Sequence, residues 1–270
     1  MDYIRRYDSR GIEERGTMDL DLRNKVALVT GGARGLGRAV CLGLAAEGAR
    51  VMINYRRDAQ GADALARLIQ EQHGADAACV AGDVASSTEV ARMFDQCERV
   101  LGPLDVLVNN AGVWPTAYVK DMTEEAWDRT LAVNLKGAFL TCREAVRRWL
   151  AAQRGGRIVN VSSPAAFVGS TTGHADYAAS KAGLVNLTVS LAREVAPQGI
   201  FVNAVAPGMM RTDLVRDALE HNAAHYLRRI PLGRIGEPEE VARVIVFLAS
   251  GRASYTTGAT VDVSGGMLMR

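Results

Sequence analysis

Residues 30–37, TGGARGLG, decide the fold of this chain. They follow a short apolar run, KVALVT (25–30), and precede a longer amphipathic segment, so the glycines stand where a strand passes into a helix. Glycines at such a point allow a tight turn, a close approach of backbone to pyrophosphate, and close packing of helix on strand. The spacing is Gly-x-x-x-Gly-x-Gly, which differs from the common Gly-x-Gly-x-x-Gly dinucleotide motif. The stretch predicts a nucleotide-binding turn, although a purely structural turn also needs glycine.

Short apolar runs alternate with longer amphipathic segments along the rest of the chain. The runs are nearly continuous in Val, Ile, Leu and Ala, which is typical of strands buried on both faces of a parallel sheet. Residues 237–250 begin with Pro238 and two glutamates and end before Gly251, as a helix does. This alternation predicts an α/β protein with a single-domain, Rossmann-type, doubly wound parallel sheet of about seven strands flanked by helices. The expected strands are residues 25–30, 49–55, 76–84, 104–110, 156–163, 200–208 and 259–266.

Composition excludes several classes of protein. The chain has 270 residues, of which 48% are hydrophobic, and no change in composition divides residues 23–270. Its net charge of +2 argues against nucleic acid or an anionic membrane as a partner. No apolar run approaches the roughly 18 residues of a membrane span. Residues 1–22 lack the apolar core of a secretory signal and are expected to form a flexible extension.

The cysteines and histidines suggest neither disulfides nor a metal site. The four cysteines show no Cys-x-x-Cys spacing, and the four histidines form no recognisable set of metal ligands. We therefore expect reduced thiols, no bound metal and a cytoplasmic location.

Polar motifs follow most of the expected strands, at the edge of the sheet where ligands bind in such folds. After TGGARGLG come NNAG (109–112), Asn134, SS (162–163), YAASK (177–181) and PG (207–208). In this order, over residues 24–269, they resemble the short-chain dehydrogenase/reductase family. Within that family the chain is most similar to the 3-oxoacyl-acyl-carrier-protein reductases, through NLKGAF, REVAPQGIFVNAVAPG and GGMLM.

The resemblance implies the catalytic residues Ser163, Tyr177, Lys181 and Asn134. Tyr177 and Lys181 are four positions apart and share one face of a helix, so the ammonium is expected to lower the phenol pKa from about 10. Tyr177 would protonate a ketone oxygen, Ser163 would hydrogen-bond that oxygen, and Asn134 would hold a water. Ser162 is the alternative to Ser163, because the interval from Ser163 to Tyr177 is one residue longer than is usual in the family.

Two further residues, His174 and Asp176, lie just ahead of Tyr177. They either touch the substrate or only shape the loop.

The cofactor implied by the resemblance is a nicotinamide dinucleotide, and the end of the second expected strand favours NADP(H). NAD-preferring enzymes usually carry an acid there, which accepts hydrogen bonds from the ribose. This chain has Asn54, Tyr55 and Arg56 instead. Arg34 could face a 2′-phosphate from the glycine turn. The alternative is that the arginines after this strand are only solvated. Asp58 is expected to cap the next helix.

The remaining cofactor contacts follow from the same resemblance. Asp83 and Val84 would contact adenine, with a helix-capping turn residue as the alternative for Asp83. The expected contacts are Gly31, Arg34, Gly35, Leu36, Gly37, Asn54, Tyr55, Arg56, Asp83, Val84, Asn109, Asn110, Ala111, Gly112, Tyr177, Lys181, Pro207, Gly208 and Thr212.

The resemblance implies an NADP(H)-dependent carbonyl reductase or alcohol dehydrogenase acting on a small ketone, alcohol or acyl thioester. A sugar or polyol dehydrogenase, and a dinucleotide sensor without catalytic activity, are the alternatives. It also implies a substrate lid near residues 209–232 and a homotetramer formed through helices at 123–153 and 177–196. The leucines Leu184, Leu187 and Leu191 of the second helix could equally belong to the internal core.

One feature separates this chain from carrier-dependent relatives. Two basic residues beside the active-site mouth meet the acidic carrier protein in those enzymes. One matches Arg154, whereas Gln198 stands at the other position. Because half of the basic patch is missing, we expect little gain from a carrier. Alternatively, Arg154 is only a surface cation at a helix end, where the helix dipole favours positive charge.

Overall fold

The computed structural model describes residues 19–170, 172–212 and 223–269. A seven-stranded sheet has the strand order β3-β2-β1-β4-β5-β6-β7, and every neighbouring pair is parallel. The order reverses between β1 and β4, which creates the switch point where such folds bind ligands. The predicted fold class is confirmed, with strands slightly shorter than expected. They are β1 Val26–Val29, β2 Arg50–Tyr55, β3 Ala77–Ala81, β4 Val106–Asn109, β5 Gly156–Val161, β6 Ile200–Pro207 and β7 Thr260–Val263.

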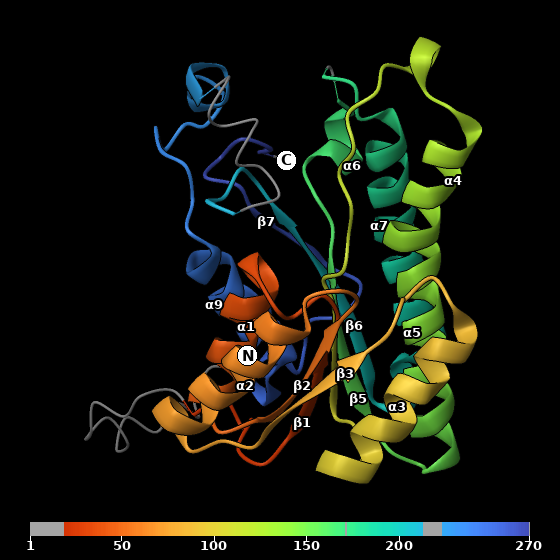
Figure 1. Ribbon diagram of the computed structural model, residues 1–270, viewed down its shortest axis with the longest axis vertical. Coiled ribbons are helices and arrows are strands. Elements are labelled where there is room, and N and C mark those ends of the chain that lie inside the picture. The colour runs from red at the N-terminus through yellow and green to blue at the C-terminus, as the bar shows by residue number, and fades with distance from the viewer. Residues whose placement is uncertain (1–18, 171, 213–222, 270) are drawn as a thin grey trace, which may run out of the picture.

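Helices cover both faces of the sheet (Figure 1). One face carries α1 (Gly35–Ala46), α2 (Ala59–His73) and α9 (Pro238–Ala249). The other carries α3 (Ser87–Leu101), α5 (Gly137–Ala151) and α7 (Ala175–Val195), with α4 (Glu124–Leu131) beside α7. Each face has its own hydrophobic cluster. Because helices pack on both faces, all four residues of β1 and of β4 are buried, which explains their continuous apolar sequence.

Several further short helical turns lie between these elements. They are η1 (Val119–Asp121), η2 (Ala132–Lys136), α6 (Ala165–Val168), η3 (Ala196–Gln198) and η5 (Gly251–Ala253). The π-helical turn η2 interrupts the helix expected at 123–153 and separates α4 from α5. Such turns often occur at functional sites, and this one carries Asn134.

The boundary of the N-terminal extension differs from the expectation. Leu22 is 2% exposed, the backbone N–H of Gly251 donates to the carbonyl of Leu20, and Arg252 donates to the carbonyl of Asp19. Residues 19–22 therefore pack against the end of α9, and the flexible extension predicted for 1–22 is corrected at these positions.

Three expected absences can be examined in the described residues. All four cysteines are unpaired. Within the described ranges no cluster of His, Cys, Asp and Glu has the arrangement of a metal site. Among the described helices, none has both the length and the apolar character of a membrane span.

Candidate active site

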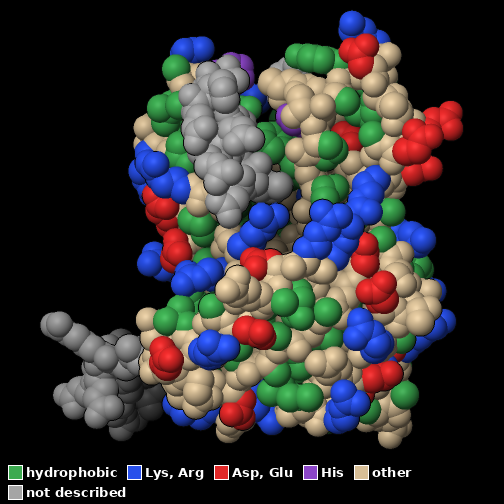
Figure 2. Space-filling view, in the orientation of Figure 1, with side chains coloured by type: hydrophobic (Ala, Val, Ile, Leu, Met, Phe, Trp, Pro, Cys, Tyr) green, Lys and Arg blue, Asp and Glu red, His purple; other side chains and the backbone are tan. Residues whose placement is uncertain are grey.

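A cavity of about 690 Å³ lies at the carboxyl ends of the strands. The glycine turn after β1 and the residues following β2 to β6 line it, and all of the predicted cofactor contacts except Asn109 are among them. Figure 2 shows this hollow face with basic side chains gathered beside the hollow. Arg34, Arg56 and Arg57 are the basic residues that line the cavity at its glycine-turn side.

The glycine turn leaves the start of α1 open to an anion. Gly31 and Gly35 have φ angles of +61° and +52°, which only glycine adopts easily. Arg34 precedes α1 without a side-chain cap, and no acid lies in the first turn. By contrast, Asp58 accepts from the N–H of Gly61 and caps α2, as predicted. The uncapped N–H groups of α1 fit the pyrophosphate of a dinucleotide.

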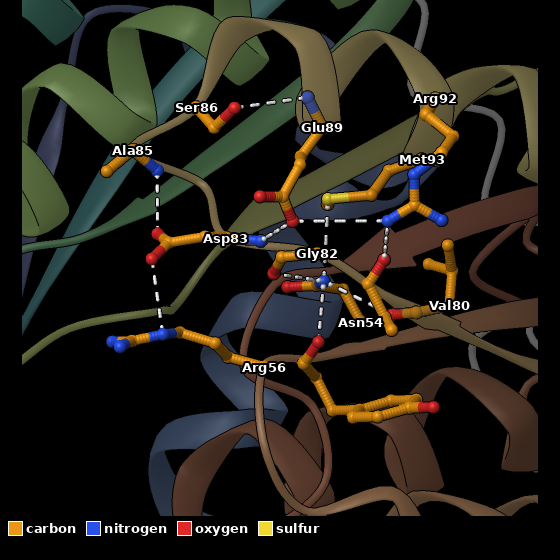
Figure 3. A network of polar contacts seen from close by, with 12 residues as sticks. Asn54, Arg56, Val80, Gly82, Asp83, Ala85, Ser86, Glu89, Arg92 and Met93 are labelled. Atoms are coloured by element: carbon orange, nitrogen blue, oxygen red, sulfur yellow. Dashed lines mark hydrogen bonds and ion pairs between the residues drawn. The ribbon is translucent and has the colours of Figure 1, made fainter.

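Asn54 connects the glycine turn with the neighbouring strand ends, and Figure 3 shows its contacts with Val80 and Gly82. Its side chain is 2% exposed, and Oδ1 accepts from the N–H of Gly31 at 3.2 Å. Its Nδ2 donates to the carbonyls of Val80 and Gly82 at 3.2 and 3.1 Å. Asn54 therefore ties the turn to the ends of β2 and β3. Asn54 also lines the cavity, so its expected contact with the cofactor stays a prediction.

Arg56 and Asp83 form an ion pair at the same end of the cavity, with 3.1 Å between Nε and Oδ2. Asp83 is itself held, because Oδ1 accepts from the N–H of Ala85 and its own N–H donates to Glu89 (Figure 3). Ser86, not Asp83, caps α3. Arg56 is thus anchored rather than merely solvated, and the capping alternative for Asp83 is wrong.

Ser163 lies against the phenol of Tyr177. The hydroxyl of Ser163 accepts from the N–H of Ala165 at 3.2 Å and forms a hydrogen bond with the Tyr177 side chain. Ser162 is turned away, since its buried hydroxyl donates to the carbonyl of Lys181. Of the two serines, the geometry therefore favours Ser163 as the partner of Tyr177.

Burial shifts the pKa values of Tyr177 and Lys181 in opposite directions. It raises the pKa of Tyr177, and the hydrogen bond from Ser163 offsets this only in part. It lowers the pKa of Lys181 to about 8. The Lys181 ammonium donates to the carbonyl of Val161 and lies 5.6 Å from the centroid of the Tyr177 ring. The expected lowering of the tyrosine pKa is therefore wrong here, because desolvation dominates. Tyr177 keeps its proton at neutral pH, in the form that can donate it.

Asn134 and Asn109 lie behind the cavity rather than on its surface. Asn134 is 1% exposed, its Oδ1 accepts from the N–H of Val113, and its Nδ2 donates to Val113 and Ser180. It therefore ties the loop after β4 to α7, and the water that Asn134 is expected to hold stays a prediction. Asn109 bonds Thr141 and Asn160 in the interior, so its expected contact with the cofactor is also wrong.

The two residues ahead of Tyr177 differ in their surroundings. His174 lines the cavity and stacks on Trp114, with ring centroids 4.3 Å apart. Asp176 is 1% exposed and accepts a hydrogen bond from Thr130 at 2.6 Å, so it joins α7 to α4 and does not line the cavity. The sequence reading missed Trp114, although its place shortly after NNAG could have shown that it follows β4 at the cavity.

The expected lid is described only in part. Leu214 and Leu219, two apolar residues of the lid expected near residues 209–232, lie outside the described residues. Tyr226 and Ile230 pack with Ile235 in a small cluster. The described members that line the cavity are Met209, Met210, Thr212, Tyr226 and Arg229.

Arg154 lies at the amino ends of the strands, whereas the cavity lies at their carboxyl ends. It precedes β5, at the amino end of that strand, and pairs with Asp105 at 2.8 Å. Within one chain it is therefore not beside the cavity mouth, which corrects that expectation. Leu184 is 1% exposed and Leu191 packs against the core, in agreement with the internal-core alternative for both.

A buried phenol that retains its proton, beside a cavity shaped for a dinucleotide, suits hydride transfer to a carbonyl group. The fold and the site define an oxidoreductase that uses a nicotinamide dinucleotide and acts on CH–OH groups. A family model described as enoyl-(acyl carrier protein) reductase matches residues 31–268. The chain belongs to the short-chain dehydrogenase/reductase family.

Characterised relatives and solved structures agree with this assignment. The chain is 41% identical over 250 residues to the 3-oxoacyl-[acyl-carrier-protein] reductase of Aquifex aeolicus, covering 93% of this chain and 100% of that protein. The Synechocystis enzyme of the same name is 42% identical, with 92% and 98% covered. A dehydrogenase/reductase from Sinorhizobium meliloti superposes with a TM-score of 0.87 at 36% identity, with 92% and 97% covered. A short-chain dehydrogenase/reductase from Mycobacterium marinum superposes with a TM-score of 0.88 at 35% identity, covering 93% of this chain and 98% of that chain.

Proposed function

We propose that the protein reduces a ketone to a secondary alcohol with NADPH. The protonated, buried Tyr177 beside Ser163 carries this proposal. When bound, the nicotinamide supplies hydride to the carbonyl carbon. Tyr177 donates its proton to the carbonyl oxygen, and the Ser163 hydroxyl donates a hydrogen bond to that oxygen as negative charge develops. The Lys181 ammonium then stabilises the phenolate that remains.

The direct test is oxidation of NADPH in the presence of an activated ketone. An α-ketoester and an acetoacetyl thioester should both be reduced. A crotonyl thioester of the same length should not be, because it lacks the ketone oxygen that Tyr177 and Ser163 address. Reduction of the enoyl thioester alone would instead favour the reaction named in the family-model description.

The rate of ketone reduction is expected to fall as pH rises through about 8, the value to which burial lowers the Lys181 pKa. Below that pH the side chain is an ammonium that stabilises the phenolate, and above it the charge is lost. The measurement is kcat/KM for NADPH against pH, which reports groups of the free enzyme. In Lys181→Arg the side chain stays charged above pH 8. The decline in kcat/KM should therefore disappear, even if this variant is slower than the wild type at every pH. A profile that stays level well above pH 8 would contradict the role of Lys181.

We expect NADPH to be preferred over NADH. Arg56 is held by Asp83 at the cavity, with Arg34 and Arg57 nearby, and Asp58 is used in capping α2. Arg56→Gln should lower kcat/KM for NADPH by about ten- to a hundredfold, because a charge-assisted hydrogen bond to phosphate is lost. The value for NADH is the internal control and should change little. A wild-type preference for NADH would refute the assignment.

Attachment of the substrate to a carrier protein is expected to bring little gain. Gln198 replaces one of the two basic residues, and Arg154 pairs with Asp105 at the far edge of the sheet. The measurement is kcat/KM for one acetoacetyl group on a carrier protein and on a short pantetheine, at low and moderate salt. A large, salt-sensitive advantage for the carrier would show that an acidic carrier docks.

A homotetramer and a cytoplasmic location stay predictions. Three large apolar side chains on α4 and α5, the helices expected at the interface, support the tetramer. They are Trp127, Phe139 and Leu150, with exposures of 38, 42 and 45%.

A further inference from the structure

His174 is a polar group at the cavity that the proposed mechanism does not use. It precedes α7, one helical turn before Tyr177, and is 4% exposed. It lines the same cavity as Ser163 and Tyr177. It stacks on Trp114, in the segment that follows β4.

The hydrogen bond of His174 fixes which of its ring nitrogens is free. Nδ1 lies 2.7 Å from the carbonyl oxygen of Pro115. A carbonyl can only accept, so Nδ1 carries the proton, and in the neutral ring Nε2 keeps a lone pair. Nε2 has no hydrogen-bond partner among the residues that the structure describes. It is therefore an acceptor available to a ligand in the cavity.

The ring is also held in place. Its stacking on Trp114 sets the plane of the imidazole. The N–H of Ala117 donates to the carbonyl of Gly173, and the N–H of Ala178 donates to the carbonyl of His174, so the backbone on both sides is fixed. An acceptor that is fixed in advance discriminates more strongly than one that must first be ordered.

Besides Trp114, the cavity lining includes the apolar residues Val168, Met209 and Met267 and the hydroxyl residues Ser170 and Thr172. A ligand that covers Nε2 in such surroundings without donating a hydrogen bond leaves a buried acceptor unpaired, which is unfavourable. We infer that His174 accepts a hydrogen bond from a hydroxyl group of the substrate, so that hydroxy ketones are preferred over ketones that lack a donor. This inference rests on the proposed ketone reduction and narrows its substrate class.

Matched pairs of ketones test the inference. Hydroxyacetone and methoxyacetone both carry an electron-withdrawing oxygen, but only the first has a donor. The pair 4-hydroxy-2-butanone and 4-methoxy-2-butanone repeats the comparison one carbon further away. For at least one pair, we expect kcat/KM with NADPH to favour the hydroxy ketone by about tenfold, the effect of one hydrogen bond.

Two variants distinguish the roles of the two ring nitrogens of His174. His174→Asn keeps an N–H near the Nδ1 position for Pro115 and removes the Nε2 acceptor, so the hydroxy preference should fall to near one. His174→Gln places an amide near the Nε2 position, where its oxygen can accept, so part of the preference should remain. Because each ratio compares two ketones on the same variant, a general loss of turnover in His174→Asn does not affect the comparison.

The outcomes distinguish this inference from the proposed function. A hydroxy preference that survives in His174→Asn, or a wild-type enzyme that reduces both members of each pair equally, would overturn the inference alone. Failure of the wild type to reduce any ketone with NADPH would contradict the proposed function itself.

Discussion

Tyr177→Phe is expected to lower kcat for ketone reduction by about 10² to 10⁴, the usual contribution of a positioned general acid. The substitution removes only the hydroxyl that donates the proton. The ring keeps its edge-to-face packing on Trp114, at 6.4 Å between centroids, and Ser163 keeps its bond to Ala165. The fold and NADPH affinity should therefore be retained. The measurement is turnover at saturating NADPH, with cofactor affinity determined separately by fluorescence.

A second tyrosine in the cavity provides the matched control. Tyr226 is 6% exposed and also lines the cavity. The two tyrosines differ in that Tyr177 is the one beside Ser163 and Lys181. Tyr226→Phe deletes the same atom from the same cavity and should keep most of the activity. Full turnover by Tyr177→Phe, or an equal loss in both variants, would show that Tyr177 is not the proton donor.

The sequence predicted the parts of the site that the backbone determines. The strands are apolar because helices cover both faces of the sheet, and the glycines mark a turn that needs positive φ at Gly31 and Gly35. Both signals are local in the sequence. The order of motifs after successive strands then placed nearly all of the predicted cofactor contacts around one cavity, because the carboxyl ends of parallel strands lie at one edge.

Side-chain direction at the strand ends could not be predicted in the same way. Asn54 and Asn109 stand at or near strand ends, as cofactor contacts do, yet each turns inward to satisfy buried polar groups. Which neighbours need a partner depends on residues far away in the sequence, such as Val80 for Asn54 and Asn160 for Asn109. The pKa of Tyr177 has the same origin, since spacing identifies Lys181 as its neighbour but does not show that burial dominates.

The position of Arg154 follows from its place in the sequence. Its position before β5 puts it at the amino end of that strand, and ligands in this fold bind at the carboxyl ends. The rule that correctly located the cavity therefore also places Arg154 away from it within one chain.

Gly37→Ala is expected to weaken NADPH binding by about ten- to a hundredfold, the scale of losing a charge-assisted hydrogen bond to phosphate. A Cβ at Gly37 would lie 2.2 Å from the carbonyl oxygen of Gly31 and 2.6 Å from Nδ2 of Asn110. Nδ2 of Asn110 already donates to the carbonyls of Thr30 and Gly31 at 3.0 Å each. The turn itself must therefore move, and with it the N–H groups at the start of α1.

The same overpacking should lower the free energy of unfolding by about 1–3 kcal/mol. Gly43→Ala on the same helix is the control, because its Cβ would meet only a methyl group of Val246, at 3.1 Å, which can adjust. Calorimetric titration with NADPH and thermal unfolding of both variants make the comparison. If Gly37→Ala binds NADPH as tightly as Gly43→Ala, the close contact between turn and helix is not what holds the cofactor site together. A loss confined to Gly37→Ala would tie cofactor affinity to this one backbone contact.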